Sequence, residues 1–458
     1  MKHSFDEVCA VVTAHIEQKK YAELKTLFGT LEPADIAAIL EKQDEGHLAL
    51  LFRILPKDLA AEVFVEMEYD VQKELLTSFS DRELCEVFDE LYLDDTVDII
   101  EEMPANVVRR VLANTDAETR GVINQLMRYP KDSAGSIMTV EYVSLRRSMT
   151  VEMAFAHIRK TGFDKETVYT CYVTDDAKRL VGVVSVRSLL LSPYEALIGD
   201  IMEENVVSVT TTEDRESTAD LFGRYDFLAI PVVDTENRLV GIITVDDAID
   251  VIKEETTEDM EIMAAIVPSE HSYFRTGILE TWKKRIPWLL LLMISATFTG
   301  AIISSFESRL GAMLILTSYI PMLMDTGGNA GGQASVTIIR ALSLGDVEFR
   351  DIFRVIWKEI RVSVLCGGVL AAVNFIKMIA VDRYLFGNEE VTLSVAFVVC
   401  ATMFITVFIS KAIGCSLPIL AKKIGFDPAV MASPFITTIV DALSLLVYFN
   451  IASSVLVF

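Results

Sequence analysis

The last stretch of the chain, PAVMASPFITTIVDALSLLVYFNIASSVLVF at residues 428–458, decides how the other segments are interpreted. As a helix rising about 1.5 Å per residue, it is long enough to cross a bilayer. Its only charged residue, Asp441, lies well inside it. A bare carboxylate in hydrocarbon costs about 3 kcal/mol or more, so Asp441 is expected to face a water-filled path or a cation.

Charge divides the chain into two parts. Of its 458 residues 52% are hydrophobic, and the net charge is −28 over residues 1–280 but +3 over residues 281–458. This predicts an acidic soluble part and a weakly basic membrane part. An acidic surface disfavours nucleic acid and favours cations. The N-terminus has no apolar run long enough for a signal peptide, which places the acidic part in the cytosol. Six scattered cysteines without a close pair argue against a disulfide framework or a zinc site.

The first part of the chain carries a weak repeat of helix-start signals. The segments PADIAAIL, PKDLAAEVF, SDRELCEVF and PANVVRRVL begin at residues 33, 56, 80 and 104. Proline in a first helical turn, followed by apolar residues every third or fourth position, is typical of a helix start. The spacing predicts an all-α superhelical domain over residues 1–134.

A second, stronger repeat follows. IMTVEYVSL at residue 137 recurs as IMEENVVSV at residue 201, and KRLVGVVSVRSLL at residue 178 recurs as NRLVGIITVDDAI at residue 237. Each copy predicts the order strand, helix, strand, strand, helix. The pair resembles tandem CBS domains, α/β modules that commonly dimerise and sense adenosine nucleotides or ions. We place the copies at residues 135–198 and 199–253, followed by a connecting helix over residues 254–285.

Five spans are expected in a membrane domain of residues 286–458, at residues 286–306, 310–339, 362–381, 391–420 and 432–457. The glycine-rich segment TGGNAGGQAS at residues 326–335 is expected to loosen or break the second span, and Lys411 and Pro418 to interrupt the fourth. Lysines and arginines precede the first span and lie between the second and third and between the fourth and fifth. This predicts a cytosolic N-terminus and an outside C-terminus.

Oxygen-bearing groups cluster around Asp441 in the sequence. Thr437 and Thr438 lie four and three residues before it, and the glycine-rich segment could offer carbonyl oxygens. One carboxylate with hydroxyls and carbonyls suits a hydrated divalent cation such as Mg²⁺. In the alternative interpretation, Asp441 pairs with Lys377 or Lys411 inside the bundle. Asp325 is better explained as a cap or partner of the glycine-rich break, and the glycines themselves are also explained by close helix packing.

Two motifs carry a family resemblance. PMLMDTGGNAGGQASVTIIRAL at residues 321–342 and DPAVMASPFITTIVDALSLLVYF at residues 427–449 resemble the MgtE family of Mg²⁺ channels, as does the order of domains. The resemblance implies a homodimer in the cell (inner) membrane that is not an enzyme. In its pore Asp441, with Thr437, binds hydrated Mg²⁺, and Asn329, Gly328 and Thr438 are candidates for the pore lining.

The resemblance also implies regulatory Mg²⁺ sites in the acidic part. The matching positions are Glu62, Asp94, Asp98, Asp214, Glu216, Asp226, Asp247, Asp250, Glu255, Glu258 and Asp259. Packed together, these acids would repel one another, so a closed assembly needs counter-cations and a cation-poor one should loosen. Each residue taken singly is also explained as a solvated surface acid, with the connecting-helix group the most credible cluster.

ATP is a weaker expectation. Family members that bind it use positions matching Arg187 and Phe227. The second CBS copy keeps a Thr-x-x-Asp pattern at Thr244 to Asp247, whereas the first has Ser185 to Ser188 and lacks the ribose-binding acid.

Two other functions compete with a Mg²⁺-gated channel. A coupled exchanger or exporter of divalent cations explains the same membrane motifs. An intramembrane aspartyl protease would use Asp325 and Asp441 as a dyad sharing a proton, but would leave the acidic part unexplained. Selectivity among Mg²⁺, Mn²⁺, Co²⁺ and Ni²⁺ is not encoded in these motifs.

Overall fold

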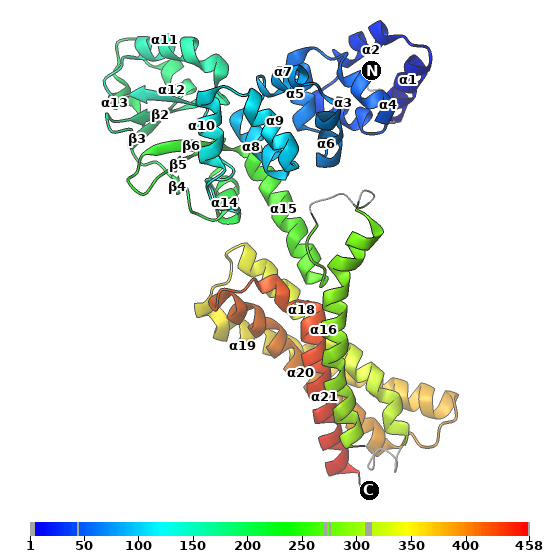
Figure 1. The fold of residues 1–458 in the computed structure, drawn as a ribbon. Helices are drawn as coiled ribbons and strands as arrows, with labels where there is room; N and C mark the ends of the chain where they lie inside the picture. Colours follow the sequence, from blue (N-terminus) through cyan, green and yellow to red (C-terminus); the bar gives the residue numbers. More distant parts are fainter. Residues whose placement is uncertain (1–4, 44, 270–272, 274–275, 307–313, 457–458) are drawn as a thin grey trace. The chain divides into compact units, whose positions relative to one another are not determined.

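The computed structural model describes the chain except for residues 1–4, 44, 270–272, 274–275, 307–313 and 457–458. The chain forms two compact units, which are unit 1, Met1–Lys253, and unit 2, Glu254–Phe458. The predicted fold class is confirmed: a helical N-terminal domain, a CBS pair, a long connecting helix and a helical C-terminal region (Figure 1).

Unit 1 begins with short helices that follow the predicted repeat. They are α1 Phe5–Glu17, α2 Tyr21–Phe28, α3 Pro33–Leu40, α4 Glu45–Phe52, α5 Lys57–Val65, α6 Tyr69–Ser78, α7 Asp81–Phe88, α8 Leu93–Glu102, α9 Ala105–Asn114 and α10 Ala117–Leu126. The four repeat segments form α3, α5, α7 and α9, which contact one another in that order. Ser80 caps α7 in a reciprocal capping box with Glu83, which satisfies two of the free amides at the helix start.

The CBS pair completes unit 1 with two three-stranded sheets. The elements are β1 Tyr142–Arg146, α11 Val151–Thr161, β2 Thr167–Thr174, β3 Leu180–Ser185, α12 Val186–Leu191, α13 Ile198–Ile201, β4 Val209–Thr210, α14 Arg215–Tyr225, β5 Ala229–Val233, β6 Leu239–Thr244 and α15 Val245–Met263. In each sheet the first pair of strands is parallel and the second antiparallel. The second copy shares one apolar core with the helical repeat. The order predicted for each copy is therefore observed.

Helix α15 differs from the connecting helix expected to begin at residue 254. It starts at Val245 as the last helix of the second CBS copy and runs unbroken to Met263. The acidic run of Glu255, Glu258 and Asp259 therefore lies on a continuation of a CBS helix, because no proline or glycine interrupts residues 245–263.

In the part that the structure describes, unit 2 has five long helices: α16 Ile278–Ser305, α18 Ile320–Ser343, α19 Ile352–Lys377, α20 Leu393–Lys423 and α21 Ser433–Val455. Short 3₁₀ segments precede three of them, at Leu314–Tyr319, Phe349–Asp351 and Pro428–Met431, and a π-helical segment, Met378–Leu385, extends α19. Among the described residues, four segments are long and apolar enough to cross a membrane: Ile278–Ser305, Phe349–Leu385, Leu393–Lys423 and Pro428–Val455. Helix α18, the second predicted span, is more polar and packs against α20 and α21 (Figure 1).

The expected breaks in two spans are wrong. Helix α18 runs continuously through the glycine-rich segment, and α20 runs through Lys411 and Pro418. In a membrane, the backbone amides are best satisfied inside a helix, and small residues let neighbouring helices approach. Close packing is thus the correct explanation of the glycines. A Cβ on Gly414 of α20 would collide with the carbonyl of Gly331 on α18.

This packing predicts different outcomes for two glycine substitutions. We expect Gly414→Ala to lower the free energy of unfolding by about 1–3 kcal/mol, because two backbones must separate. Gly368→Ala on α19 is the control, since its Cβ meets nothing within 4 Å. Unfolding in detergent with added denaturant compares the two. Equal stabilities would contradict the close contact of α18 and α20.

Candidate functional site

Asp441 lies on α21 with its side chain partly buried. Its Oδ1 atom is buried and has no hydrogen-bond partner among the described residues. A buried carboxylate oxygen is normally hydrogen-bonded or paired with a cation. This oxygen therefore has the unsatisfied acceptor capacity that a cation or its water shell would use.

The two predicted pore threonines have different surroundings. Thr437 lies against α18, where a Cβ on Gly328 would be 3.2 Å from its Oγ1. Thr438 donates its hydroxyl hydrogen to the Pro434 carbonyl at 3.1 Å. Gly328 is buried at this contact, whereas Asn329 is exposed. Thr437 thus lies at the contact of α18 and α21, Asn329 is on the exposed surface of α18, and the hydroxyl of Thr438 is used inside its own helix.

Pairing of Asp441 with an intramembrane lysine is not observed. The Nζ of Lys377 lies 2.9 Å from Oδ2 of Asp382, and the Nζ of Lys411 lies 3.6 Å from Oε2 of Glu359. Both lysines are thus engaged with other carboxylates. Neither lysine is therefore the partner that a purely structural explanation of Asp441 requires.

Unit 1 gathers acids from α8 and from the start of α15. Burial, followed by repulsion from Asp95, raises the pKa of Asp94 to about 7. Burial, followed by repulsion from Asp94, raises the pKa of Asp247 to about 7. Asp98 reaches the surface, but lost hydration and then repulsion from Asp94 still raise its pKa to about 8. The structure therefore brings together three of the predicted regulatory residues.

Three further acids belong to this group and were not among the predicted Mg²⁺ ligands. Burial raises the pKa of Asp95 to about 7 and that of Glu166 to about 8, with repulsion from Asp247 and from Asp94 as the next causes. Burial also raises the pKa of Glu141, which accepts a hydrogen bond from the Leu93 amide at 3.0 Å. We call Asp94, Asp95, Asp98, Glu141, Glu166 and Asp247 the α8 acidic cluster. Glu141 and Glu166 precede β1 and β2, so only the folded sheet shows their proximity to α8.

Unsatisfied atoms occur within the α8 acidic cluster. Oδ1 of Asp94 and Oε2 of Glu166 are buried and lack hydrogen-bond partners among the described residues. In the described part of the chain, no three His, Cys, Asp or Glu side chains are arranged closely enough to hold a metal ion. Repulsion between like charges would keep the carboxylates of the α8 acidic cluster apart until a cation neutralises them.

Five other predicted regulatory residues of unit 1 lie apart from the α8 acidic cluster. Glu62 is exposed on α5, and Asp214 caps α14 by accepting from the Ser217 amide at 3.0 Å. Asp226 ends α14 with a left-handed backbone, φ 56°. The carboxylate of Asp250 is 2.7 Å from the Nζ of Lys253. Glu216 is also exposed, in the first turn of α14.

The end of α15 presents a second acidic group, in unit 2. Burial, then repulsion from Asp427 and Glu258, raises the pKa of Asp259. Asp427 lies in the loop before α21, where its carboxylate accepts from the Ala429 amide at 2.8 Å. Asp427 was not predicted, because in the sequence it resembles an ordinary cap residue. Glu255 and Glu258 lie on α15 with Asp259 and are partly buried.

The predicted nucleotide residues lie in different CBS copies. Arg187 is exposed in the first turn of α12. The ring of Phe227 stacks on that of Tyr225, with centroids 5.3 Å apart. In the first copy the hydroxyls of Ser185 and Ser188 are 2.9 Å apart. In the second copy the matching positions are Thr244 and Asp247, and the Thr244 hydroxyl donates to the Asp247 carboxylate.

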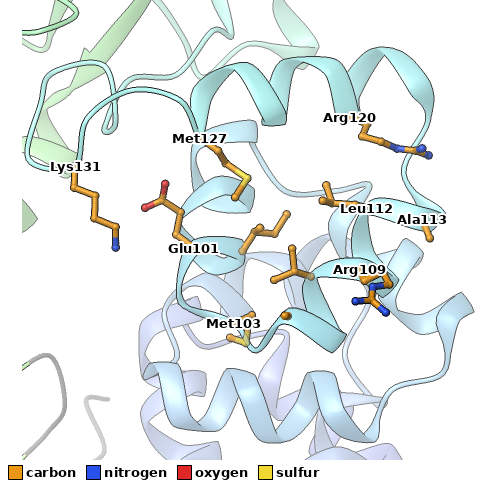
Figure 2. Close-up of a pocket in the computed structure, with 11 residues that line it drawn as sticks. Glu101, Met103, Arg109, Leu112, Ala113, Arg120, Met127 and Lys131 are labelled. Atoms are coloured by element: carbon orange, nitrogen blue, oxygen red, sulfur yellow. The ribbon is translucent and has the colours of Figure 1, made fainter.

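A cavity of about 680 Å³ lies between α8, α9 and α10 (Figure 2). Its walls are mainly apolar, with Met103, Leu112 and Met127 among them. Two arginines, Arg109 and Arg120, and one lysine also line it. These positive charges disfavour a cation, so we do not assign this cavity to cation handling.

Comparison with known proteins decides the family. Residues 320–451 match MgtE, described as a divalent cation transporter, and residues 31–132 match the MgtE intracellular N domain. Residues 134–194 and 198–254 each match a CBS domain. A magnesium transporter MgtE of Thermus thermophilus is 36% identical over 433 residues, 94% of this chain and 94% of that one. The chain belongs to the MgtE family.

Other MgtE proteins agree with this assignment. One from Bacillus subtilis, also named a magnesium transporter, is 33% identical over 98% of each chain. A crystal structure of the cytosolic domain of the Mg²⁺ channel MgtE in complex with ATP has a TM-score of 0.51 and 36% identity. It covers 53% of this chain, and the match covers 99% of that structure. MgtE proteins are transporters, so this chain is a membrane protein with an intracellular N domain, and the protease interpretation of Asp325 and Asp441 is wrong.

Proposed function

We propose that this MgtE protein is a Mg²⁺-selective channel for Mg²⁺ uptake, in which the ion passes Asp441. The buried, unpartnered Oδ1 of Asp441 is the observation that carries the proposal. A hydrated Mg²⁺ ion needs oxygen acceptors for its water molecules, which Asp441 and Thr437 supply with Asn329 nearby. Gly328 lets α18 and α21 pack closely at Thr437, and Thr438 is a proposed lining residue whose hydroxyl bonds within α21.

The channel is proposed as a homodimer. Asp325, Asn329 and Gln333 follow one another at every fourth position of α18 and are exposed on the surface of the single chain. Polar groups at membrane depth need water or protein around them. A second copy facing this surface would enclose a water-filled path. The positive charges of the loops orient it with unit 1 in the cytosol and the C-terminus outside.

Closure is proposed to follow from Mg²⁺ binding to the acidic groups on the cytosolic side. A cation that neutralises the α8 acidic cluster stabilises the packing of α8 against α15, which continues toward unit 2. A second contribution comes from Glu255, Glu258 and Asp259 at the end of α15, close to Asp427. Glu62, Asp214, Glu216, Asp226 and Asp250 remain proposed ligands of the closed dimer. The proposal for these five residues is supported by the sequence resemblance to the family.

ATP is a proposed ligand of the CBS pair. A related cytosolic domain was solved with ATP, and Arg187 and Phe227 are the proposed contacts in this chain. The serine at position 188 offers a hydroxyl in place of a ribose-binding carboxylate.

The conduction proposal is tested by Mg²⁺ flux into proteoliposomes under an imposed membrane potential, with no counter-ion gradient. A channel conducts under voltage alone. A coupled exchanger, the competing proposal, requires a second ion on the opposite side. Flux that appears only after a proton or sodium gradient is added would favour the exchanger.

The raised pKa values of the α8 acidic cluster predict a pH-dependent stability of unit 1. Acids whose folded pKa exceeds the unfolded value stabilise the fold below about pH 4, and this stability is lost as pH rises to about 7–8. In EDTA the midpoint of thermal unfolding should therefore fall by several degrees from pH 6 to pH 8.5, since about 1 kcal/mol shifts it by about 2–4 °C. Mg²⁺ should raise the midpoint more at pH 8.5 than at pH 6, because ionised carboxylates bind it.

The Asp94→Asn/Asp247→Asn double variant should flatten both dependences in the full-length protein. Asp35→Asn, at an exposed acid of α3, serves as the matched control and should behave as the wild type. A double variant that keeps the full response to pH and Mg²⁺ would exclude the α8 acidic cluster as the sensor.

A further inference from the structure

Asp325, near the start of α18, does not have the role that the sequence predicts for it. The sequence favours Asp325 as a cap of a broken span, but α18 is continuous from Ile320 to Ser343. The side chain is exposed and makes no hydrogen bond or ion pair with another described residue. Asp325 is the only charged residue between Ile320 and Ile339. Its charge therefore needs a different explanation.

The packing of α18 against α21 fixes the level of Asp325 along the helix bundle. A Cβ on Gly331 would meet Ile436, 2.8 Å away, and one on Gly327 would meet Val440, 2.9 Å away, and Ser444. Residue numbers thus rise along α18 as they fall along α21, and the two helices are antiparallel. Asp325 lies about half a turn before Gly327, at the level of Asp441 on α21.

The two carboxylates interact across this contact. Asp325 repels Asp441, and neither has a basic partner among the described residues, because Lys377 and Lys411 pair with Asp382 and Glu359. An exposed, unpaired carboxylate in a membrane helix belongs in contact with water. Asp325 also begins the exposed polar series that continues with Asn329 and Gln333. The water-filled path proposed above is the place where this side chain can remain charged.

We propose that Asp325 is a second, non-ligating charge of the ion path, which concentrates divalent cations at the level of Asp441. The inference rests on the proposed channel function. A carboxylate attracts a divalent ion twice as strongly as a monovalent one, so Asp325 favours Mg²⁺ over K⁺ and Na⁺. Two copies of the chain would place four carboxylates at this level, two from Asp325 and two from Asp441. Asp325 thereby sets the concentration of Mg²⁺ at which the path fills.

The test compares Mg²⁺ uptake by full-length wild type, Asp325→Asn and Asp325→Glu in proteoliposomes over a range of outside Mg²⁺. At low ionic strength we expect Asp325→Asn to raise the half-saturating Mg²⁺ concentration about five- to tenfold, with a maximal flux near that of wild type. The difference should shrink in high salt, because salt screens charges in water. Asp325→Glu should restore the wild-type value. Glu389→Gln removes an exposed acid in the loop between α19 and α20 and is the matched control.

The outcomes separate this inference from the channel proposal. A half-saturating concentration that is unchanged in Asp325→Asn, while the wild type conducts and Asp441→Ala does not, overturns the role of Asp325 alone. A loss of flux that is equal at all ionic strengths and is not restored by Asp325→Glu also overturns it, because that result indicates a structural role. A wild-type protein without voltage-driven flux overturns the proposed function itself.

Discussion

Mg²⁺ flux through the Asp441→Ala protein should fall at least about tenfold, while the protein remains folded. The substitution removes the carboxylate that we propose to face the ion path, and a difference of about 1.4 kcal/mol in stabilisation of the passing ion already gives a factor of ten. The fold should tolerate it, since Oδ1 of Asp441 has no hydrogen-bond partner among the described residues and the side chain is repelled by Asp325. Uptake into proteoliposomes and thermal unfolding measure the two effects.

Asp441→Asn is the closer variant, since it keeps the shape and removes the charge. It should also lose most of the Mg²⁺ flux. An asparagine protein that conducts Mg²⁺ at the wild-type rate would show that the charge of Asp441 is dispensable. A protein that fails to fold would show instead that the residue has a structural partner.

Removal of Glu359 should destabilise unit 2 by about 3–5 kcal/mol, the cost of leaving one member of a buried ion pair alone. Glu359 on α19 and Lys411 on α20 are 8% and 6% exposed, and their charged atoms are 3.6 Å apart. Glu359→Ala would leave the ammonium of Lys411 surrounded by apolar helices. Unfolding of the purified protein in detergent measures the loss.

A double variant distinguishes the loss of the two charges from the loss of the volume that the two side chains fill. Glu359→Leu/Lys411→Met removes both charges and keeps the volume, so it should recover most of the stability lost in Glu359→Ala. Lys377→Met is the control, because the Lys377 side chain is half exposed, so its pair with Asp382 is more accessible to water than the Glu359–Lys411 pair and its removal should cost less. Similar losses in Glu359→Ala and Lys377→Met would contradict a buried role for the Glu359–Lys411 pair.

Local signals in the sequence predicted most of the architecture. Prolines and a capping serine at the repeat starts indicated α3, α5, α7 and α9, because such residues satisfy or omit the free amides of a first helical turn. The duplicated β-branched runs predicted both sheets, because β-branched residues favour strands. The limits of α15 were missed, since nothing in residues 245–263 distinguishes a CBS helix from a connecting helix.

The glycine-rich segment was misinterpreted because glycine has two uses. In water, its backbone freedom breaks helices, whereas between membrane helices its small size permits contact. The contact of Gly331 with Gly414 depends on another helix and is invisible in the local sequence. The acidic sites were predicted unevenly for a similar reason. Asp94 and Asp98 stand out in one helix, but Glu141 and Glu166 join them only through the folding of β1 and β2 against α8.

We propose that Mg²⁺ passes Asp441 under voltage and that Mg²⁺ on the side of unit 1 stops it. The most direct measurement is the current through the full-length protein in a planar bilayer, at fixed voltage, as Mg²⁺ is raised on that side alone. We predict a Mg²⁺ current that falls as this Mg²⁺ rises, and that persists in the Asp94→Asn/Asp247→Asn double variant. A current that does not respond to Mg²⁺ on the unit 1 side, or one that is the same in Asp441→Ala, would contradict the account.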